Sequence, residues 1–467
     1  MSAQPQFDVE VPRRERFALL RRELRLLLRS RMAVAALALL GVLSLAACLN
    51  GFHQVRAQAA AIEHAQALQG ESADLLMARY GREKEPGIIS YHRFVLTWDA
   101  PAPLGFAAIG QRDIAPWLLR VRPLGLQAQL YEGDHANPEL ALAGRFDFAF
   151  VLVYLAPLVL IALLHDLISS EREAGRLRLL HSLPGAGRGL WQRRAGLRAA
   201  AVWLALSAPA CGVAVLAGAP VQQWAGLLTV AALYLLFWAG LCVWLGARER
   251  SSGAHAAHLI GAWLLLCLVL PTLGQAALQR ALPAESGMEL MLAQREEVHA
   301  GWDRPKPETF ERFFQDHPEW RDTAPVKERF HWKWYYALQH AGDWSVREQV
   351  AAYRSTIEAR ERGARKLGWL LPGVAAQAGV HRLADSDLEA HLAYLDRVAS
   401  LHRELRLHLY PYVFDERPWT PADAASAPVY RDAHGDSSLP AQLWLMLLIA
   451  AGIGLGLGRR GLRRIGG

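Results

Sequence analysis

The densest group of residues suited to contact with another protein lies between residues 168 and 184. Glu171 and Glu173 offer carboxylates that could pair with a basic groove on a partner, and Gly175 permits a turn or a close approach. Leucines follow, and Pro184 should end the helix. These residue types fit transmission of force between two proteins, and they fit an ordinary helix beside a membrane equally well.

The sequence contains no motif that would bind a nucleotide. Residues 185–189 are rich in glycine and basic, but they lack the Lys-Ser or Lys-Thr pair that a phosphate-binding loop requires. We interpret them as a loop between two helices. No Ser-His-Asp order and no paired carboxylates in an apolar setting stand out. We therefore expect no catalytic residues and assign no enzyme activity to the chain.

The histidines are too dispersed to predict a metal site. His255 and His258 are three residues apart, whereas His391 and His402 are eleven apart and could share one helical face. The first pair has no nearby carboxylate or thiolate that would complete a ligand set, and we interpret the second pair as surface histidines. We expect no metal and no cofactor in this chain, and a membrane enzyme that uses the external histidines stays open as a minor alternative.

Long apolar runs dominate the rest of the sequence and predict a mainly α-helical, polytopic membrane protein. A membrane helix needs about 20 apolar residues. Six runs meet this requirement, at residues 32–49, 146–167, 199–218, 224–246, 259–278 and 439–458. The third to fifth runs, which fill residues 199–278, contain Pro209 and Pro271. Membrane helices tolerate proline where neighbouring groups satisfy the freed carbonyls.

Arginine clusters predict the orientation of these spans. They occupy residues 13–31, 172–198, 248–250 and 459–464, which fall on one side of the membrane if the six spans alternate. By the positive-inside rule this side is cytoplasmic, so we expect both termini in the cytoplasm and the spans in a bacterial inner membrane. Anionic membrane lipids then account for the net charge of +7, and we expect no nucleic-acid partner.

The spans divide the remaining chain into cytoplasmic and external segments. Residues 1–31 are expected to form a cytoplasmic amphipathic helix on the inner leaflet, and residues 459–467 a basic cytoplasmic tail. Residues 168–198 form a second cytoplasmic segment. Residues 50–145 and 279–438 are expected to be two large, mostly helical periplasmic segments.

Apolar residues at three- and four-residue spacing predict individual helices within the external segments. These predicted helices cover residues 57–80, 308–314, 327–339, 346–366 and 386–409. Residues 369–374 are apolar but too short to span, and they could rest on the outer membrane surface.

The second external segment also holds a dense group of aromatic residues. They are Phe310, Phe313, Phe314, Trp320, Phe330, Trp332, Trp334, Tyr335 and Tyr336. We expect a helical core with an interfacial aromatic belt, and the alternative is a docking or substrate surface.

The segment after the second span resembles the signature of ABC-2-type permeases. The matching residues run from Ile168 to Gly175 and continue at Leu177, Leu179, Leu180, Ser182 and Pro184. Arg176 stands where that family usually has threonine, which could change the docking contact.

Further features resemble permeases that carry the DUF3526 domain. The stretch 107–116 contains an external motif of four residues: Gly110, Gln111, Arg112 and Asp113. Asn137-Pro138 and residues 144–150 resemble the chain that leads into the second span of those permeases. The order of spans and external segments is similar as well, so the resemblance covers nearly the whole chain.

The resemblance implies a permease subunit of an ABC-2-type transporter, which exports across the inner membrane. It implies that two separate cytoplasmic ATPase subunits bind ATP and Mg²⁺, and that a second copy or a related permease completes the membrane part. Residues 168–198 would be the coupling segment that contacts the ATPase. Its candidate coupling residues are Glu171, Arg172, Glu173, Gly175, Leu177, Leu180 and Pro184.

Other functions stay open at this point. The chain could be a mechanotransmitter that moves no solute and drives a periplasmic protein through residues 279–438, or a structural anchor. The sequence does not identify a substrate, because no charged residue lies in the middle of a span.

Overall fold

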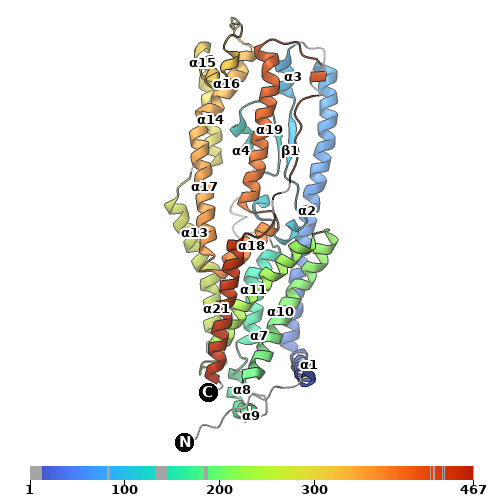
Figure 1. Cartoon of the computed structure of the whole chain (residues 1–467), viewed down its shortest axis with the longest axis vertical. Helices are drawn as coiled ribbons and strands as arrows, with labels where there is room; N and C mark the ends of the chain where they lie inside the picture. Colours follow the sequence, from blue (N-terminus) through green and yellow to red (C-terminus); the bar gives the residue numbers. More distant parts are fainter. Residues whose placement is uncertain are drawn as a thin grey trace.

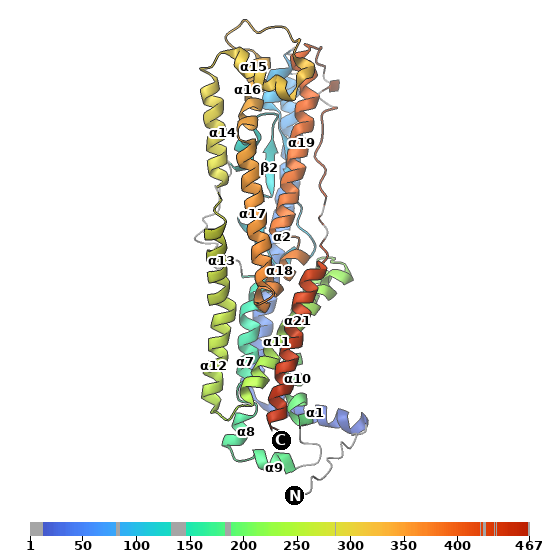
Figure 2. The same ribbon diagram turned by 60° about the vertical axis from the view of Figure 1, so that its left-hand side comes forward.

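The structure is a computed structural model that describes residues 13–80, 85–131, 146–182, 188–284, 286–420, 422–423, 426–433, 435 and 437–465. These residues form an elongated, mainly helical molecule with an apolar bundle at one end (Figures 1 and 2). At the other end lies a second body, here called the distal domain. It comprises the far half of the first long helix and the described residues of 85–131 and 286–433.

The bundle is built from helices that run along the long axis, with short helices at one end. Its elements are α1 (Arg13–Arg29), α2 (Arg31–Tyr80), α6 (Phe148–Phe150), the π-helical turn η3 (Val151–Leu155), α7 (Ala156–Leu164), α8 (Ser169–Glu173), α9 (Leu177–Ser182), α10 (Arg188–Leu216), α11 (Val221–Gly246), α12 (Ser252–Leu264), the π-helical turn η4 (Leu265–Val269), α13 (Leu270–Ala281) and α21 (Ala441–Ile465). The end that holds α1, α8, α9 and the last turn of α21 is here called the basal end (Figure 2).

Six helical runs in the described part of the chain are long and apolar enough to cross a membrane. They are Arg31–Tyr80, Phe148–Glu173, Gly189–Leu216, Val221–Gly246, Ser252–Ala281 and Ala441–Ile465. Each overlaps one of the six runs predicted from the sequence. The prediction of a mainly helical protein with six candidate spans is therefore confirmed by length and composition.

The helix α2 is much longer than the predicted first span. The prediction ended this span at residue 49 and placed a separate helix at 57–80, but one helix continues without a break to Tyr80. The sequence between the two contains no proline that would interrupt it. Gly51 lies where a Cβ atom would overlap the carbonyl of Phe106, so this glycine lets the turn η1 (Gly105–Ala107) approach the helix.

The two segments predicted to be external fold together into one domain. Residues 85–131 supply α3 (Pro86–His92), β1 (Val95–Trp98), η2 (Gly110–Asp113), β2 (Leu118–Val121) and α4 (Leu126–Tyr131). The second segment supplies α14 (Gly287–Gly301), α15 (Lys306–Asp316), η5 (Pro318–Trp320), α16 (Trp332–Ser345), α17 (Arg347–Leu367), α18 (Pro372–Leu383) and α19 (Leu388–Phe414). Four of these helices agree with prediction, although α16 begins five residues later, whereas α14 and α18 were not predicted.

A small antiparallel sheet is the main departure from the predicted helical segments. Strands β1 and β2 pair with Val95 opposite Val121 and Trp98 opposite Leu118. One face packs on α19, where the Thr97 hydroxyl lies 2.9 Å from the Tyr394 hydroxyl. Four-residue strands carry too short an alternation to be recognised, so contact with α19 rather than local pattern explains this sheet.

The aromatic group of the second external segment supplies the core of the far end. Phe313 is buried and stacks on Phe414 with ring centroids 4.4 Å apart, and Trp320 and Tyr336 join the same cluster. The predicted helical core is confirmed for these buried side chains. Phe330, which is 43% exposed, lies at the surface.

Close contact between α11 and α21 holds the centre of the bundle together. A Cβ atom on Gly240 would overlap the backbone of Gly454, and one on Gly454 would lie 2.5 Å from the Cα atom of Phe237. Small residues allow membrane helices to approach until their backbones touch. The helix α18 packs on the distal ends of these two helices, so residues 369–374 lie at this boundary.

We expect Gly454→Val to lower the melting temperature of the purified protein, because overpacking of a tight contact costs about 1–3 kcal/mol. The matched control is Gly456→Val on the same helix, where nothing lies within 4 Å of an added Cβ atom. Thermal unfolding in the same detergent compares the two variants. Equal melting temperatures would contradict the packing described here.

Candidate functional site

The predicted coupling segment is two short helices at the basal end rather than one. Gly175 has φ of +71°, and the backbone turns there between the end of α8 and the start of α9. The expected turn at this glycine is therefore present. Leu177 and Leu180 are half-buried against the bundle core, whereas Leu179 is 64% exposed. Pro184 and the glycine-rich residues 185–187 lie outside the described residues.

Glu171 joins α8 to two other helices through charged contacts. Its Oε1 lies 3.2 Å from Nη1 of Arg194 on α10, and Nε of the same arginine lies 3.0 Å from Oε2 of Glu23 on α1. Its Oε2 also lies 2.7 Å from Nε of Arg176. The side chains of Glu23, Arg194 and Glu171 are at most 18% exposed. We call these three residues the basal clamp.

Arg172 and Glu173 fix α8 to the start of the fifth candidate span. Arg172 donates from Nη1 to the carbonyl of Arg248 at 2.9 Å. The Glu173 carboxylate accepts from the backbone N–H of Ser252 at 2.8 Å and from its hydroxyl at 3.1 Å. A carboxylate at the start of α12 also interacts favourably with the helix dipole.

The contacts of the two glutamates change the hypothesis made from the sequence. Glu171 and Glu173 were expected to offer carboxylates to a basic groove of a partner, but in the structure both are bound within the chain. The exposed surface of this segment is instead carried by α9 and by Arg176, whose side chain is 59% exposed. The α8 segment therefore links α1, α10 and α12, and α9 projects from it.

The external motif forms a joint inside the distal domain. Gly110 has φ of +54°, and the backbone N–H of Gln111 donates to the Ser386 carbonyl at 2.8 Å. Arg112 is buried; it donates to Gln58 of α2 at 3.1 Å, and its Nη1 lies 2.5 Å from Oδ2 of Asp99. Asp113 ends the same turn. The motif thus ties α2, the loop after β1 and the turn before α19 to one another.

A second arginine completes this joint from α19. Nη2 of Arg397 lies 3.1 Å from Oδ1 of Asp99 and 3.5 Å from Oδ1 of Asp432. Asp99 is therefore held between two guanidinium groups, which remain charged at every accessible pH. A buried carboxylate in this position would be strongly destabilising if either arginine were removed.

Asp147 contributes to the same region. It is buried directly before α6. Its Oδ1 accepts from the Phe150 N–H at 3.0 Å and caps α6, and its Oδ2 accepts from the Ile109 N–H at 3.1 Å. An Asp directly before an apolar helix is a common N-cap, which is the signal that could have identified this role.

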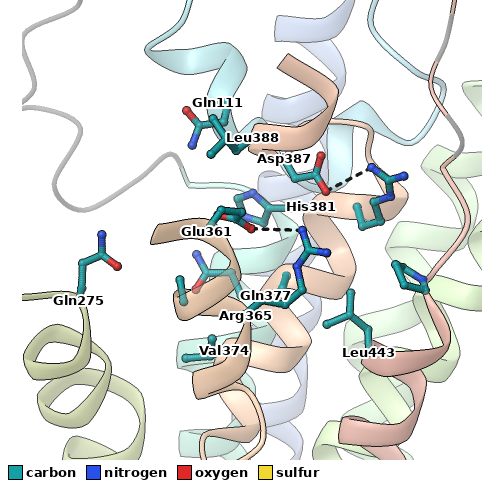
Figure 3. Close-up of a pocket in the computed structure, with 14 residues that line it drawn as sticks. Gln111, Gln275, Glu361, Arg365, Val374, Gln377, His381, Asp387, Leu388 and Leu443 are labelled. Carbon is teal, nitrogen blue, oxygen red and sulfur yellow. Dashed lines mark ion pairs between the residues drawn. The ribbon is translucent and has the colours of Figure 1, made fainter. Parts of the chain in front are cut away.

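A pocket lies beside the external motif, at the boundary between the distal domain and the bundle (Figure 3). This boundary pocket has a volume of about 280 Å³ and is lined by Gln111, Gln275, Glu361, Ala364, Arg365, Val374, Gln377, Ala378, His381, Arg382, Asp387, Leu388, Pro440 and Leu443. Figure 3 shows Gln275 on a separate helix, across the pocket from His381.

The charges of the boundary pocket largely balance. Arg382 lies 3.6 Å from Asp387, and Arg365 lies 3.7 Å from Glu361. Nε of Arg382 is buried and has no hydrogen-bond partner in the described part of the chain.

The histidines considered for metal binding or catalysis do not converge. His402 is buried and its Nε2 lies 2.6 Å from the Leu124 carbonyl, while His391 lies near the Tyr394 ring. His255 is buried beside α8, whereas His258 lies 2.5 Å from the Ala254 carbonyl. Among the described residues no three His, Cys, Asp or Glu side chains are grouped as metal ligands.

We expect Gly110→Ala to destabilise the protein more than Gly218→Ala. Both glycines have positive φ, at +54° and +68°, so alanine costs about 1–2 kcal/mol of backbone strain at each. Only at Gly110 would the new Cβ atom meet the Ser386 carbonyl and lie 2.8 Å from His381 Nδ1. Thermal unfolding measures the difference, and equal losses in both variants would contradict the described joint.

Burial lowers the pKa of His381 to about 4, against the opposing effect of Asp387. An unfolded histidine titrates near pH 6.5. As the pH falls below this value, the unfolded chain binds a proton that the folded chain does not, so stability decreases towards about pH 4. We expect His381→Gln to show a smaller fall in melting temperature between about pH 7 and pH 5 than the unmodified protein. Identical falls would contradict a neutral His381 in the folded protein.

Comparison with known proteins identifies one region of the chain. A family model described as "Domain of unknown function (DUF3526)" matches residues 288–432, which contain α15 to α19 and nearly all of α14. No curated protein matches the chain. The matched region is less than half of the chain, and it confirms the DUF3526 part of the predicted resemblance.

Proposed function

We propose that this chain is the permease subunit of an ABC-2-type transporter, in which separate cytoplasmic ATPase subunits drive export across the inner membrane. The basal clamp is the observation that carries this proposal. It fixes α8 to α1 and α10 through partly buried ion pairs, and α9 projects beyond it with Leu179 exposed. A partner that pushes on α9 would therefore move several helices together.

The strength of these contacts is adequate for such a role. Hydrogen bonds to charged groups contribute about 1.5–3 kcal/mol each when they are shielded from water. Two partly buried contacts of this kind meet at Arg194, and Glu173 adds two exposed hydrogen bonds, which contribute less, at the start of α12. The α8 segment would thus move as part of the bundle rather than yield separately.

The partners follow from what the sequence contains. No phosphate-binding loop is present in the sequence, so ATP and Mg²⁺ would be bound by the ATPase subunits. A second copy or a related permease would complete the membrane part. The basal end would face the cytoplasm, where its arginines meet anionic lipids and the exposed leucines of α1 enter the inner leaflet.

A second function is favoured by the length of α2. This helix passes from the basal end to the distal domain, where Gln58 accepts from Arg112 and Gln69 accepts from the Leu96 N–H at 3.0 Å. A continuous helix would carry movement to the distal domain and to a periplasmic partner without transport of a solute. A membrane enzyme is less well supported, because His391 and His402 do not form a joint site.

We expect Glu171→Lys to reduce the amount of ATPase that co-purifies with the chain at least ten-fold, because lysine would repel Arg194 and Arg176 and release α8. The ratio of the two proteins after affinity purification is the measurement. Glu358→Lys on α17 is the matched control, since it removes ion pairs to Arg354 and Arg362 in the distal domain. This control should retain the ATPase.

Gly175→Trp adds bulk at the surface of the basal end, at the cost of about 1–2 kcal/mol of backbone strain because Gly175 has φ of +71°. Nothing lies within 4 Å of an added Cβ atom at this position, so the indole would project towards a partner rather than into the bundle. We expect an unchanged elution volume in gel filtration together with loss of the ATPase. Survival of the complex in both variants would contradict the coupling assignment.

A further inference from the structure

A cavity in the described part of the distal domain lies apart from the boundary pocket. This distal cavity has a volume of about 830 Å³. It is lined by α2, by the face of the β1–β2 sheet that turns away from α19, and by α4, α14 and α16. Each of these elements contributes side chains to its wall, and both external segments of the sequence are needed to form it.

The charged residues in the wall of the distal cavity are all basic. They are Arg120, Arg122, Arg295 and His299, and the described wall contains no Asp or Glu. Arg120 and Arg122 form no ion pair within the described residues. Arginine does not lose its charge in proteins, so this wall stays positive at any working pH.

Asp343, whose partners include the wall residue Gln294, is already paired with an arginine. Asp343 accepts from the Leu126 N–H at 2.8 Å and from Gln294 at 2.6 Å, and its Oδ2 lies 2.6 Å from Arg406 Nη2. This aspartate does not line the cavity and is held by its own arginine. The charges of Arg120 and Arg122 therefore remain available to a ligand.

Three glutamine side chains bind the backbone of the segment that follows β2. Gln129 accepts from the Arg122 N–H at 2.7 Å, Gln339 accepts from the Gly125 N–H at 2.9 Å, and Gln294 accepts from the Ala128 N–H at 2.9 Å. These contacts fix the backbone between β2 and α4. The two strand arginines are consequently presented by an ordered frame, which lowers the entropy lost when a ligand binds.

The same wall also carries apolar and aromatic side chains. They include Leu68 of α2, which is 47% exposed, with Tyr91, Phe94, Leu96 and Val298. The guanidinium of Arg120 lies 5.6 Å from the centre of the Phe94 ring. A ligand that fills this cavity would meet positive charge and apolar surface at once.

We propose that the distal cavity binds an anionic amphiphile, in which an apolar body carries a phosphate or carboxylate group. The anionic group pairs with Arg120 and Arg122, since arginine forms paired hydrogen bonds with such groups. The apolar body covers Leu68 and Phe94. This site does not depend on the ATPase contact proposed above, and its test uses the purified chain without ATP.

The test measures binding of dodecyl phosphate to the full chain in dodecyl maltoside, a detergent with the same alkyl chain and an uncharged head. We expect saturable binding in microscale thermophoresis. Arg120→Gln with Arg122→Gln should weaken it at least ten-fold, whereas the exposed α17 variant Arg362→Gln should not. Ala65→Trp, which fills the cavity and leaves every arginine in place, should weaken it similarly.

Two further ligands identify the source of the anion. Inorganic phosphate should bind at least ten-fold more weakly than dodecyl phosphate, because it lacks the apolar body. Tighter binding of dodecyl phosphate than of naphthoate would indicate a lipid, and the reverse would indicate a soluble aromatic acid. Equal affinity in the double variant, or equal affinity for inorganic phosphate and both amphiphiles, would overturn the proposal.

Discussion

One uninterrupted helix joins the two ends of this protein, and the arrangement of the other elements depends on it. The 50 residues of α2 correspond to a rod about 75 Å long. In its basal half it packs against α10, and in its distal half it contacts η1, β1 and α3. Contacts at Gly51 and Gln58 keep this rod in register with the distal domain.

The positions of buried charges agree with this arrangement. Asp99 is held by Arg112 and Arg397 at the point where α2, the loop after β1 and α19 meet. Arg194 is held by Glu23 and Glu171 where α1, α8 and α10 meet. Buried ions must be paired to persist, so each cluster fixes the relative position of three elements more strictly than apolar packing would. On the proposed function, movement enters at the second cluster and leaves at the first.

The sequence predicted those parts of the fold that depend on local pattern. The apolar runs identified six candidate spans, and helical spacing identified α15, α17 and α19. The positive φ at Gly175 agrees with the turn expected there. Contacts between distant residues were not predicted, because they leave no periodic signal. The sheet depends on Tyr394 of α19, and the merging of both external segments depends on pairs such as Leu126 with Asp343.

In the candidate site, too, the sequence predicted the local segment but not its contacts with residues far away in the chain. Residue types identified the segment around Glu171, but they did not reveal that Arg194, in the following helix, and Glu23, far earlier in the chain, would engage it. The Gly110–Asp113 motif came from resemblance alone, and its role as a joint became visible only through Gln58, Asp99 and Ser386.

Photocrosslinking from α9 tests the central claim most directly. A benzoylphenylalanine placed at Leu179, which is 64% exposed, would be irradiated in intact membranes, with Leu75 of distal α2, 71% exposed, as the control position. The account predicts that position 179 captures a protein whose peptides contain ABC ATPase motifs and that position 75 does not. Capture of no such ATPase from position 179, or equal capture from both positions, would contradict it.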